Sequence, residues 1–154
     1  MSGAAEQLAA LGLTLPPVTA PAAAYVPAVR TGPYVYVSGQ LPVVDGKLPA
    51  TGKVGDAVSA QDAAGLARTC ALNAIAAAAA AAGGLDRIRR IVKVTGFVAS
   101  APGFNGQPQV VNGASELLIE VFGEAGRHAR SAVGMAVLPR DSPVEVELIA
   151  EVRD

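Results

Sequence analysis

The feature that most limits the fold of this chain is a run of alanines near its middle. Between Ala74 and Ala82 only Ile75 is not an alanine. Alanine has the highest helix propensity, and its single methyl group lets a helix lie close to its neighbours. The run is much shorter than the roughly 20 apolar residues that cross a bilayer. It therefore predicts a tightly packed helix inside a folded domain.

Signals at both ends of the run set the bounds of this helix. Ser59 and Asp62 have the spacing of a capping box, and Asp62 also suits the positive end of a helix. Gly83-Gly84 supplies the left-handed residue at which helices commonly end. One apolar stripe recurs at three- and four-residue steps and comprises Leu66, Cys70, Ala74, Ala77 and Ala81. We expect one long helix that packs against a sheet along this stripe.

Segments rich in β-branched and aromatic residues lie on both sides of the helix and have the composition of strands. Residues 34–41 follow a Gly32-Pro33 turn, and a second such segment covers residues 88–98. Asp45-Gly46 has the chemistry of a tight hairpin turn that needs positive φ. We expect a strand with a short hairpin return before the helix and a second major strand after it.

The rest of the chain repeats the alternation of helix and strand. Apolar residues at helical spacing predict a second helix between Val111 and Phe122. Residues 131–138 and 144–152 then have the composition of two closing strands around a turn. This order indicates a single α+β domain with a largely antiparallel or mixed sheet and two helices packed on one face.

The sheet face that no helix covers must be polar or must be buried by a partner. We expect four apolar strand residues to lie uncovered on it, which are Tyr36, Val94, Met135 and Val146. Exposed apolar patches of this kind mark association surfaces, and soluble oligomers are mostly closed and symmetric. Self-association as a ring or dimer is therefore predicted.

The N-terminus is interpreted as an extension, residues 1–24, that precedes the folded domain, residues 25–154. It has a short helical pattern from Glu6 to Gly12, followed by a stretch rich in Pro and Ala that should run extended over a surface. The start lacks the positively charged region of a secretory signal. A cytoplasmic location is expected.

Composition excludes several function classes. Lys and Arg number 12 against 13 Asp and Glu, with no basic run, which disfavours nucleic acid as a partner. The single Cys and single His exclude an internal disulfide and any metal site built from Cys and His alone. The sequence contains no phosphate loop, dinucleotide fingerprint or nucleophile elbow. Neither a metal nor a cofactor is expected, and no membrane association is predicted.

Five short motifs, separated along the chain, carry more specific information about function. Near the C-terminus, Arg130-Ser131 enters a strand, Leu138-Pro139 forms a turn, and Val144-Glu145-Val146 opens the last strand. Upstream, Ser38-Gly39-Gln40 ends the first strand and Tyr25 precedes it. In order and spacing these motifs resemble the Rid (YjgF) family of reactive-intermediate imine and enamine deaminases, also described as the endoribonuclease L-PSP family.

The resemblance covers roughly residues 24–152 and implies a chorismate-mutase-like subunit assembled as a homotrimer, with a cleft at each subunit interface. Catalytic members of the family hydrolyse 2-imino acids to 2-oxo acids and ammonia. By resemblance, Arg130 holds the substrate carboxylate, for which a planar guanidinium is suited. Glu145 positions or deprotonates the attacking water. Such chemistry needs orientation and a proton shuttle, without a metal.

The resemblance assigns roles to further positions. Tyr25 and the backbone at Ser38-Gly39 would come from the adjoining subunit, Asn112 would add a polar edge, and the Ala132 backbone would lie beside the imine. His128 and Ala132 stand where the family often has Pro and Cys. These departures resemble a divergent branch of the family.

The residues with charged or aromatic side chains also have structural interpretations. An Arg before a strand is typical of a surface or interface ion pair, which applies to Arg130. Glu145 and Glu147 alternate with apolar residues, as in any half-solvated strand. Tyr25 is amphipathic and also suits a cap on the N-terminal arm.

The smaller candidates have similar alternatives. Ser38 and Asn112 also suit hydrogen bonds to backbone groups at the ends of a strand and a helix. Cys70 lies on the helix stripe and is interpreted as a small buried hydrophobe. His128 could shuttle protons near neutral pH, although it matches a position without a catalytic role in the family.

Two further functions are open beside the deaminase. A non-enzymatic trimer could bind 2-oxo or 2-imino carboxylates at the same pocket through Arg130. Loss of turnover in Glu145→Gln with retained carboxylate affinity would distinguish the enzyme from such a binding protein. Ribonuclease activity fits poorly with the near-neutral charge.

Overall fold

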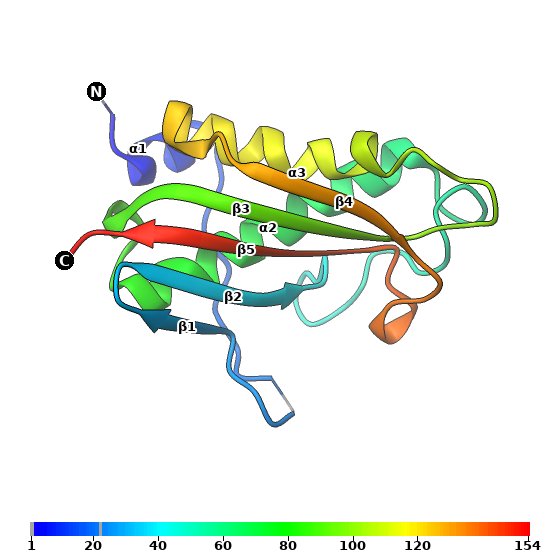
Figure 1. Cartoon of the computed structure of the whole chain (residues 1–154), viewed down its shortest axis with the longest axis horizontal. Helices are drawn as coiled ribbons and strands as arrows, with labels where there is room; N and C mark the ends of the chain where they lie inside the picture. The colour runs from blue at the N-terminus through cyan, green and yellow to red at the C-terminus, as the bar shows by residue number, and fades with distance from the viewer. Residues whose placement is uncertain (1, 22) are drawn as a thin grey trace.

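Five strands form one mixed sheet in the order β1-β2-β5-β3-β4. The structure, a computed structural model, describes residues 2–21 and 23–154. β4 runs parallel to β3, and all other neighbours are antiparallel. The two closing strands therefore do not pair with each other, because β5 lies between β2 and β3 while β4 forms an edge (Figure 1). The strands are β1 (Ala28–Thr31), β2 (Tyr34–Gln40), β3 (Ile88–Ala99), β4 (Ala129–Met135) and β5 (Val144–Val152).

Two long helices, α2 (Ala60–Ala82) and α3 (Gln107–Phe122), cover one face of this sheet. In Figure 1 the strands β3, β4 and β5 pass in front of them. The described residues also form three short 3-10 helices, namely η1 (Leu85–Arg87), η2 (Gly123–Gly126) and η3 (Pro139–Asp141). The predicted α+β domain with a mixed sheet is confirmed.

The capping signals of α2 act as predicted. The amide of Asp62 donates to Ser59 Oγ at 3.0 Å, and Gly83 has φ 87° at the C-terminal end. The buried side of the helix is broader than the predicted stripe, since it is centred on Ala63, Ala67 and the alanines after Cys70. Leu66 and Ala81 lie at its margin, half-buried. The helix packs against both the sheet and α3, so burial extends around more of its surface.

The Asp45-Gly46 turn forms without the strands that it was expected to join. Asp45 has φ 52° and Gly46 has φ 77°, and Val44 and Lys47 exchange two backbone hydrogen bonds of 2.9 and 3.1 Å. Only this single bridge is present. The turn was predicted correctly, but the segment after it is too short to form a strand.

The prediction for the uncovered face was half wrong. Tyr36 and Met135 are 47% and 37% exposed, as expected, whereas Val94 and Val146 are completely buried beneath the helices. The pairing register explains the difference, because Val146 lies beside Gly96, whose Cα faces Val111 of α3. The sheet face away from the helices, called the open face below, carries Tyr34, Tyr36, Lys93, Thr95, Phe97, Val133, Met135, Glu145, Glu147 and Ile149.

The predicted N-terminal extension, residues 1–24, is described at 2–21 and 23–24, and part of it packs into the domain. Its helix α1 (Ala4–Ala10) lies beside α3 and η1, and Leu8 is only 5% exposed. The Ala5 amide donates to Asp86 Oδ1 at 3.1 Å. The short strand β1 follows this segment and was not predicted.

By length and composition α2 alone among the described helices could cross a membrane. However, most of the residues in its most apolar 18-residue stretch are buried inside the domain, as in the core helix of a soluble protein. The domain is of the soluble type.

The contact between α2 and α3 depends on a glycine. A Cβ at Gly113 would run into the backbone carbonyl of Ala64. We expect Gly113→Ala to lower the free energy of unfolding by about 3 kcal/mol, as overpacking of a rigid contact does. Gly65→Ala is the matched control, because nothing lies within 4 Å of its Cβ position. This control should gain about 0.5–1 kcal/mol of helix propensity. Urea unfolding measures both, and equal effects would contradict the close contact.

Candidate active site

Arg130 is anchored to the start of α3. This residue lies on the edge strand β4, beside the buried Val94 of β3, so its side chain projects on the helix side of the sheet. Nη1 donates to Asn112 Oδ1 at 2.8 Å and to Ser115 Oγ at 3.2 Å, and Nη2 donates to the Pro108 carbonyl at 3.4 Å. Three acceptors from one helix therefore hold the guanidinium in place.

The anchoring leaves one edge of the Arg130 guanidinium open. Within residues 2–21 and 23–154, no hydrogen bond involves Nε, and Nη2 uses only one of its two hydrogens. A guanidinium has five donors in a fixed planar fork that matches a carboxylate in bidentate geometry. The arrangement thus presents an oriented anion-binding edge.

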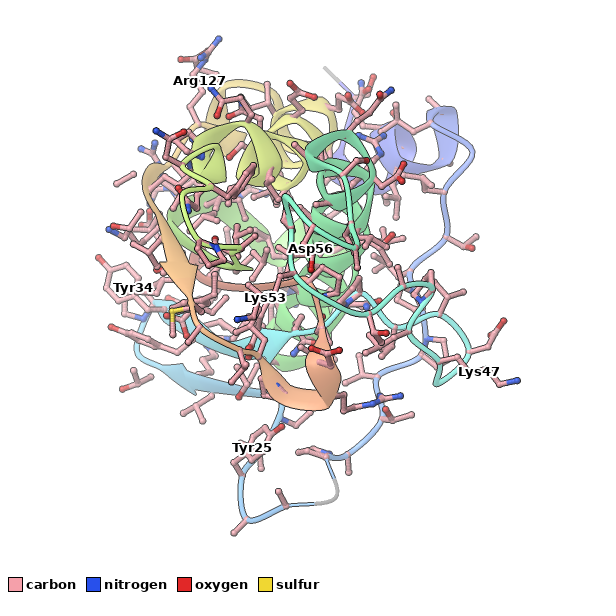
Figure 2. All side chains as sticks on the ribbon, turned by 90° about the vertical axis from the view of Figure 1, so that its right-hand side faces the viewer. Tyr25, Tyr34, Lys47, Lys53, Asp56 and Arg127 are labelled. Atoms are coloured by element: carbon pink, nitrogen blue, oxygen red, sulfur yellow. The ribbon has the colours of Figure 1, made fainter. Side chains whose placement is uncertain are left out.

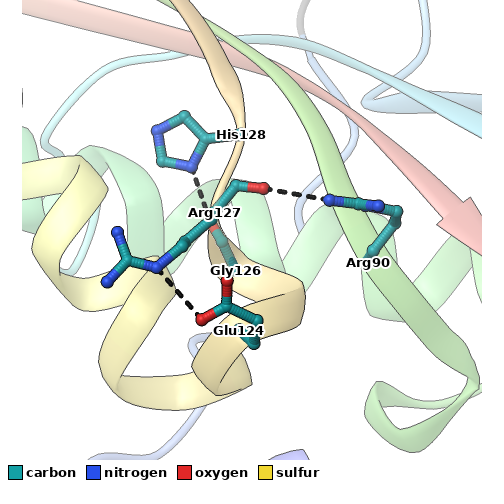
Figure 3. A network of polar contacts seen from close by, with 5 residues as sticks. All are labelled: Arg90, Glu124, Gly126, Arg127 and His128. Carbon is teal, nitrogen blue, oxygen red and sulfur yellow. Dashed lines mark hydrogen bonds and ion pairs between the residues drawn. The ribbon is translucent and has the colours of Figure 1, made fainter.

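His128 lies next to Arg130 and makes two hydrogen bonds that fix its tautomer. Nδ1 lies 2.6 Å from the carbonyl oxygen of Gly126, which can only accept, so Nδ1 carries the proton (Figure 3). Nε2 is then an acceptor, and Ser115 Oγ donates to it at 2.9 Å. Burial lowers the pKa of His128, against the opposing effect of the Gly126 hydrogen bond, and nearby Arg130 lowers it further. The lowered pKa favours the neutral imidazole.

These side chains line one groove between α3 and β4. Arg127, which precedes His128, is held at its backbone and at its side chain. Arg90 Nη2 donates to the Arg127 carbonyl at 3.3 Å, and Arg127 Nε donates to Glu124 Oε2 at 3.1 Å (Figure 3). The groove is lined by Ser115, Ile119, Arg127, His128 and Arg130. It combines two cationic groups with a neutral imidazole.

A second cluster forms where β2 meets β5. Glu145 lies against Gly39 so closely that a Cβ at position 39 would collide with its carboxylate. Burial raises the pKa of Glu145, and the neighbouring carboxylate of Glu147 raises it further. A carboxyl group with a raised pKa is suited to proton transfer near neutral pH. Gly39 therefore serves this cluster by leaving room for the Glu145 side chain.

Ser38, next to Gly39, links this second cluster to the loop that carries Tyr25. Ser38 Oγ donates to the Val26 carbonyl at 2.7 Å, and the Ser38 amide donates to the Pro27 carbonyl at 2.9 Å. Ser38 thus ties down the loop that carries Tyr25. Tyr25 itself is 56% exposed, and Figure 2 shows it on the loop that projects below the domain.

The structure does not bring the two clusters together within one chain. Glu145 pairs with Phe97 on the open face, whereas Arg130 and Ala132 pair with Val94 and Gly96 on the helix face. Strand β3 lies between β5 and β4 and keeps these two strands about 10 Å apart. The two side chains are separated further because they project from opposite faces of the sheet. A site that used both Arg130 and Glu145 would have to combine two copies of the chain.

Comparison with known proteins identifies the family. The chain matches, over residues 5–152, the model of the family described as "YjgF/chorismate mutase-like, putative endoribonuclease". The chain belongs to the YjgF family. The resemblance found in the motifs is thereby confirmed, and the match also includes most of α1.

Individual relatives agree with a divergent branch of the YjgF family. Protein TCP17 of Trypanosoma cruzi is 45% identical over 151 residues, which are 97% of this chain and 94% of that protein. The Atu1372 structure from Agrobacterium tumefaciens is 48% identical, with a TM-score of 0.90 over 97% of this chain and 92% of that one. Escherichia coli TdcF, solved with bound serine, is 30% identical, with a TM-score of 0.64 over 89% and 94% of the two chains.

Two features of this YjgF-family chain were not found from the sequence. Ser115 carries no motif of its own, and only its place three residues after Asn112, on the same side of a predicted helix, could have indicated it. A second hollow lies in the open face, where Lys93 Nζ donates to Ser131 Oγ at 3.2 Å. The hollow is lined by Tyr36, Val37, Lys93, Thr95, Glu147, Leu148 and Ile149.

Cys70 and Asn73 have structural roles in α2. Cys70 is fully buried with Sγ 3.8 Å from the Val144 carbonyl oxygen, and burial raises its pKa well above the ordinary value, which makes a thiolate unfavourable. Asn73 Nδ2 donates to the carbonyls of Leu41 and Val43 at 2.9 and 3.1 Å. The Glu145 carboxylate is a second, smaller cause of the raised pKa of Cys70.

The raised pKa of Glu145 predicts how stability depends on pH. The folded protein holds this proton more tightly than the unfolded chain, so the contribution favours folding at low pH and is lost as pH rises through the folded pKa. Glu145→Gln should therefore raise the free energy of unfolding at pH 7, by a fraction of 1 kcal/mol given the solvent exposure of the site. Below about pH 4 the gain should vanish, because the carboxyl is then neutral.

Glu151→Gln is the control, since Glu151 pairs with Arg89 Nη1 at 3.2 Å on the same strand. Urea unfolding at both pH values measures the two variants. A lower stability of Glu145→Gln at pH 7 would show that the ionised carboxylate is favoured in the fold.

Proposed function

We propose that this chain is a hydrolytic deaminase of reactive 2-imino acids and enamines, which it converts to 2-oxo acids and ammonia. The observation that carries the proposal is the anchored guanidinium of Arg130, whose Nε and Nη2 edge remains open for a carboxylate. TdcF, a relative at 30% identity, binds serine, which also carries a carboxylate next to a nitrogen-bearing carbon. Membership of the YjgF family supports the same reaction class.

The reaction requires few catalytic groups. An imine carbon is already electrophilic, so oriented substrate, water and a proton shuttle are sufficient. Glu145 accepts a proton from the attacking water and returns it to the leaving nitrogen, for which its raised pKa is suited. The Ala132 backbone lies two residues beyond Arg130 on the same face of β4 and adjoins the imine. Asn112 provides the polar edge next to Arg130.

The site is completed between copies of the chain. Arg130 of β4 and Asn112 of α3 lie on the helix face, whereas Glu145 lies against Gly39 where β2 meets β5, and Ser38 ties down the loop that carries Tyr25. One copy therefore supplies the carboxylate clamp and the adjoining copy supplies the water-activating group. The open face, with its exposed Tyr36 and Met135, provides the surface for a homotrimer. We place the protein in the cytoplasm.

Carboxylate binding tests the clamp directly. Arg130→Ala should weaken binding of a 2-oxo acid by about 2 to 5 kcal/mol, the usual cost of removing one partner from a desolvated charge pair. Arg127→Ala is the matched control, because this exposed arginine lines the same groove and is paired with Glu124. Titration calorimetry with pyruvate measures both, and equal affinities for wild type and Arg130→Ala would refute the clamp.

Turnover tests the proposed reaction. An amino-acid oxidase generates imines in solution, and release of the 2-oxo acid is measured above the spontaneous rate. Glu145→Gln should lose about 100-fold or more of this acceleration, the usual contribution of a general base, while it keeps its affinity for pyruvate. Glu151→Gln on the same strand is the control, because Glu151 pairs with Arg89. If folded, oligomeric wild type does not accelerate release of the 2-oxo acid from any of a panel of amino acids, the deaminase proposal is wrong. The alternative is then a protein that binds carboxylates without turnover.

A further inference from the structure

The groove between α3 and β4 contains an arrangement that imine hydrolysis does not use. Ser115 Oγ donates to His128 Nε2 at 2.9 Å, and His128 Nδ1 donates to the Gly126 carbonyl at 2.6 Å. In acyl transfer, serine is activated when its hydroxyl is hydrogen-bonded to a base and a third group orients that base. Here a backbone carbonyl takes the place of the carboxylate that usually orients the histidine.

We propose that Ser115 is a nucleophile, activated by His128, that hydrolyses small carboxylic esters bearing a second, anionic carboxylate. This activity does not depend on the imine chemistry proposed above. It uses one chain only, because the serine, the histidine and the neighbouring arginine line the same groove.

Arg130 supports this chemistry in two ways. Its Nη1 donates to Ser115 Oγ at 3.2 Å, which stabilises the oxygen as it loses its proton. Its open Nε and Nη2 edge binds the substrate carboxylate. Asn112 lies one turn earlier on α3 and directs Oδ1 to Arg130, so its amide hydrogens remain for the oxyanion of the tetrahedral intermediate.

The steps conserve atoms and protons. Ser115 Oγ bonds to the acyl carbon while its proton moves to His128 Nε2. The bond from that carbon to the alcohol oxygen then breaks, and the proton passes from Nε2 to the leaving alcohol. Water attacks the acyl-serine, gives a proton to Nε2, and releases the dicarboxylic acid as the proton returns to Ser115 Oγ. Neither oxidant nor reductant is required.

The test is acylation of the intact protein by 4-nitrophenyl hemisuccinate. Wild type should release a burst of nitrophenol, and mass spectrometry should locate the succinyl group on Ser115. Ser115→Ala should carry no adduct, and His128→Gln should acylate roughly 100-fold more slowly, as expected for loss of a general base. Neutral 4-nitrophenyl acetate should react more slowly than the anionic ester.

Ser131→Ala is the matched control, since Ser131 contacts Lys93 but no imidazole and should not affect labelling. The mass of the adduct is read without reference to imine turnover, so this proposal and the deaminase can fail separately. Wild type without an adduct on Ser115 would overturn the nucleophile. Equal rates for the two esters would overturn the selection of anionic substrates.

Discussion

The close contact of α3 with α2 and the sheet determines where the chemistry of this protein can lie. At Gly113 the backbone of α3 approaches Ala64 of α2, and at Gly96 the sheet approaches Val111. Larger side chains at these positions would move α3 outwards. Because Arg130 is held by acceptors on the first turns of α3, such a shift would separate the guanidinium from Asn112 and Ser115. The small residues of the helices thus position the groove.

The two faces of the sheet divide the polar residues into separate groups. Alternation along β5 directs Val146 into the core and Glu145 to the open face, while the parallel register of β4 directs Arg130 towards α3. Arg130 and Glu145 thus lie on opposite faces of the sheet and on strands that β3 separates, so one chain does not present both groups to one cavity. Association of copies is therefore the simplest way to combine the guanidinium with the carboxylate, and the open face offers the surface.

Local signals in the sequence predicted local structure well and long-range placement less well. Ser59 and Gly83 fixed α2 because capping depends on neighbours in the chain. Val94 was assigned to the wrong face although it alternates with Lys93 and Thr95, because alternation separates the two faces of a strand but does not say which face the helices cover. The motifs pointed to Arg130 and Glu145 as candidates, but the separation of these two residues is a property of strand order. Ser115 was missed because its contact with His128 joins α3 to the short link between η2 and β4.

Arg130 also couples substrate binding to the basicity of His128. Its positive charge is one cause of the lowered pKa of the imidazole. A carboxylate on the Nε and Nη2 edge would offset that charge and leave the Nη1 contacts to Asn112 and Ser115 in place. The imidazole would then accept a proton more readily when an anionic substrate is bound than when the groove is empty. The base therefore becomes stronger at the moment when Ser115 must lose its proton.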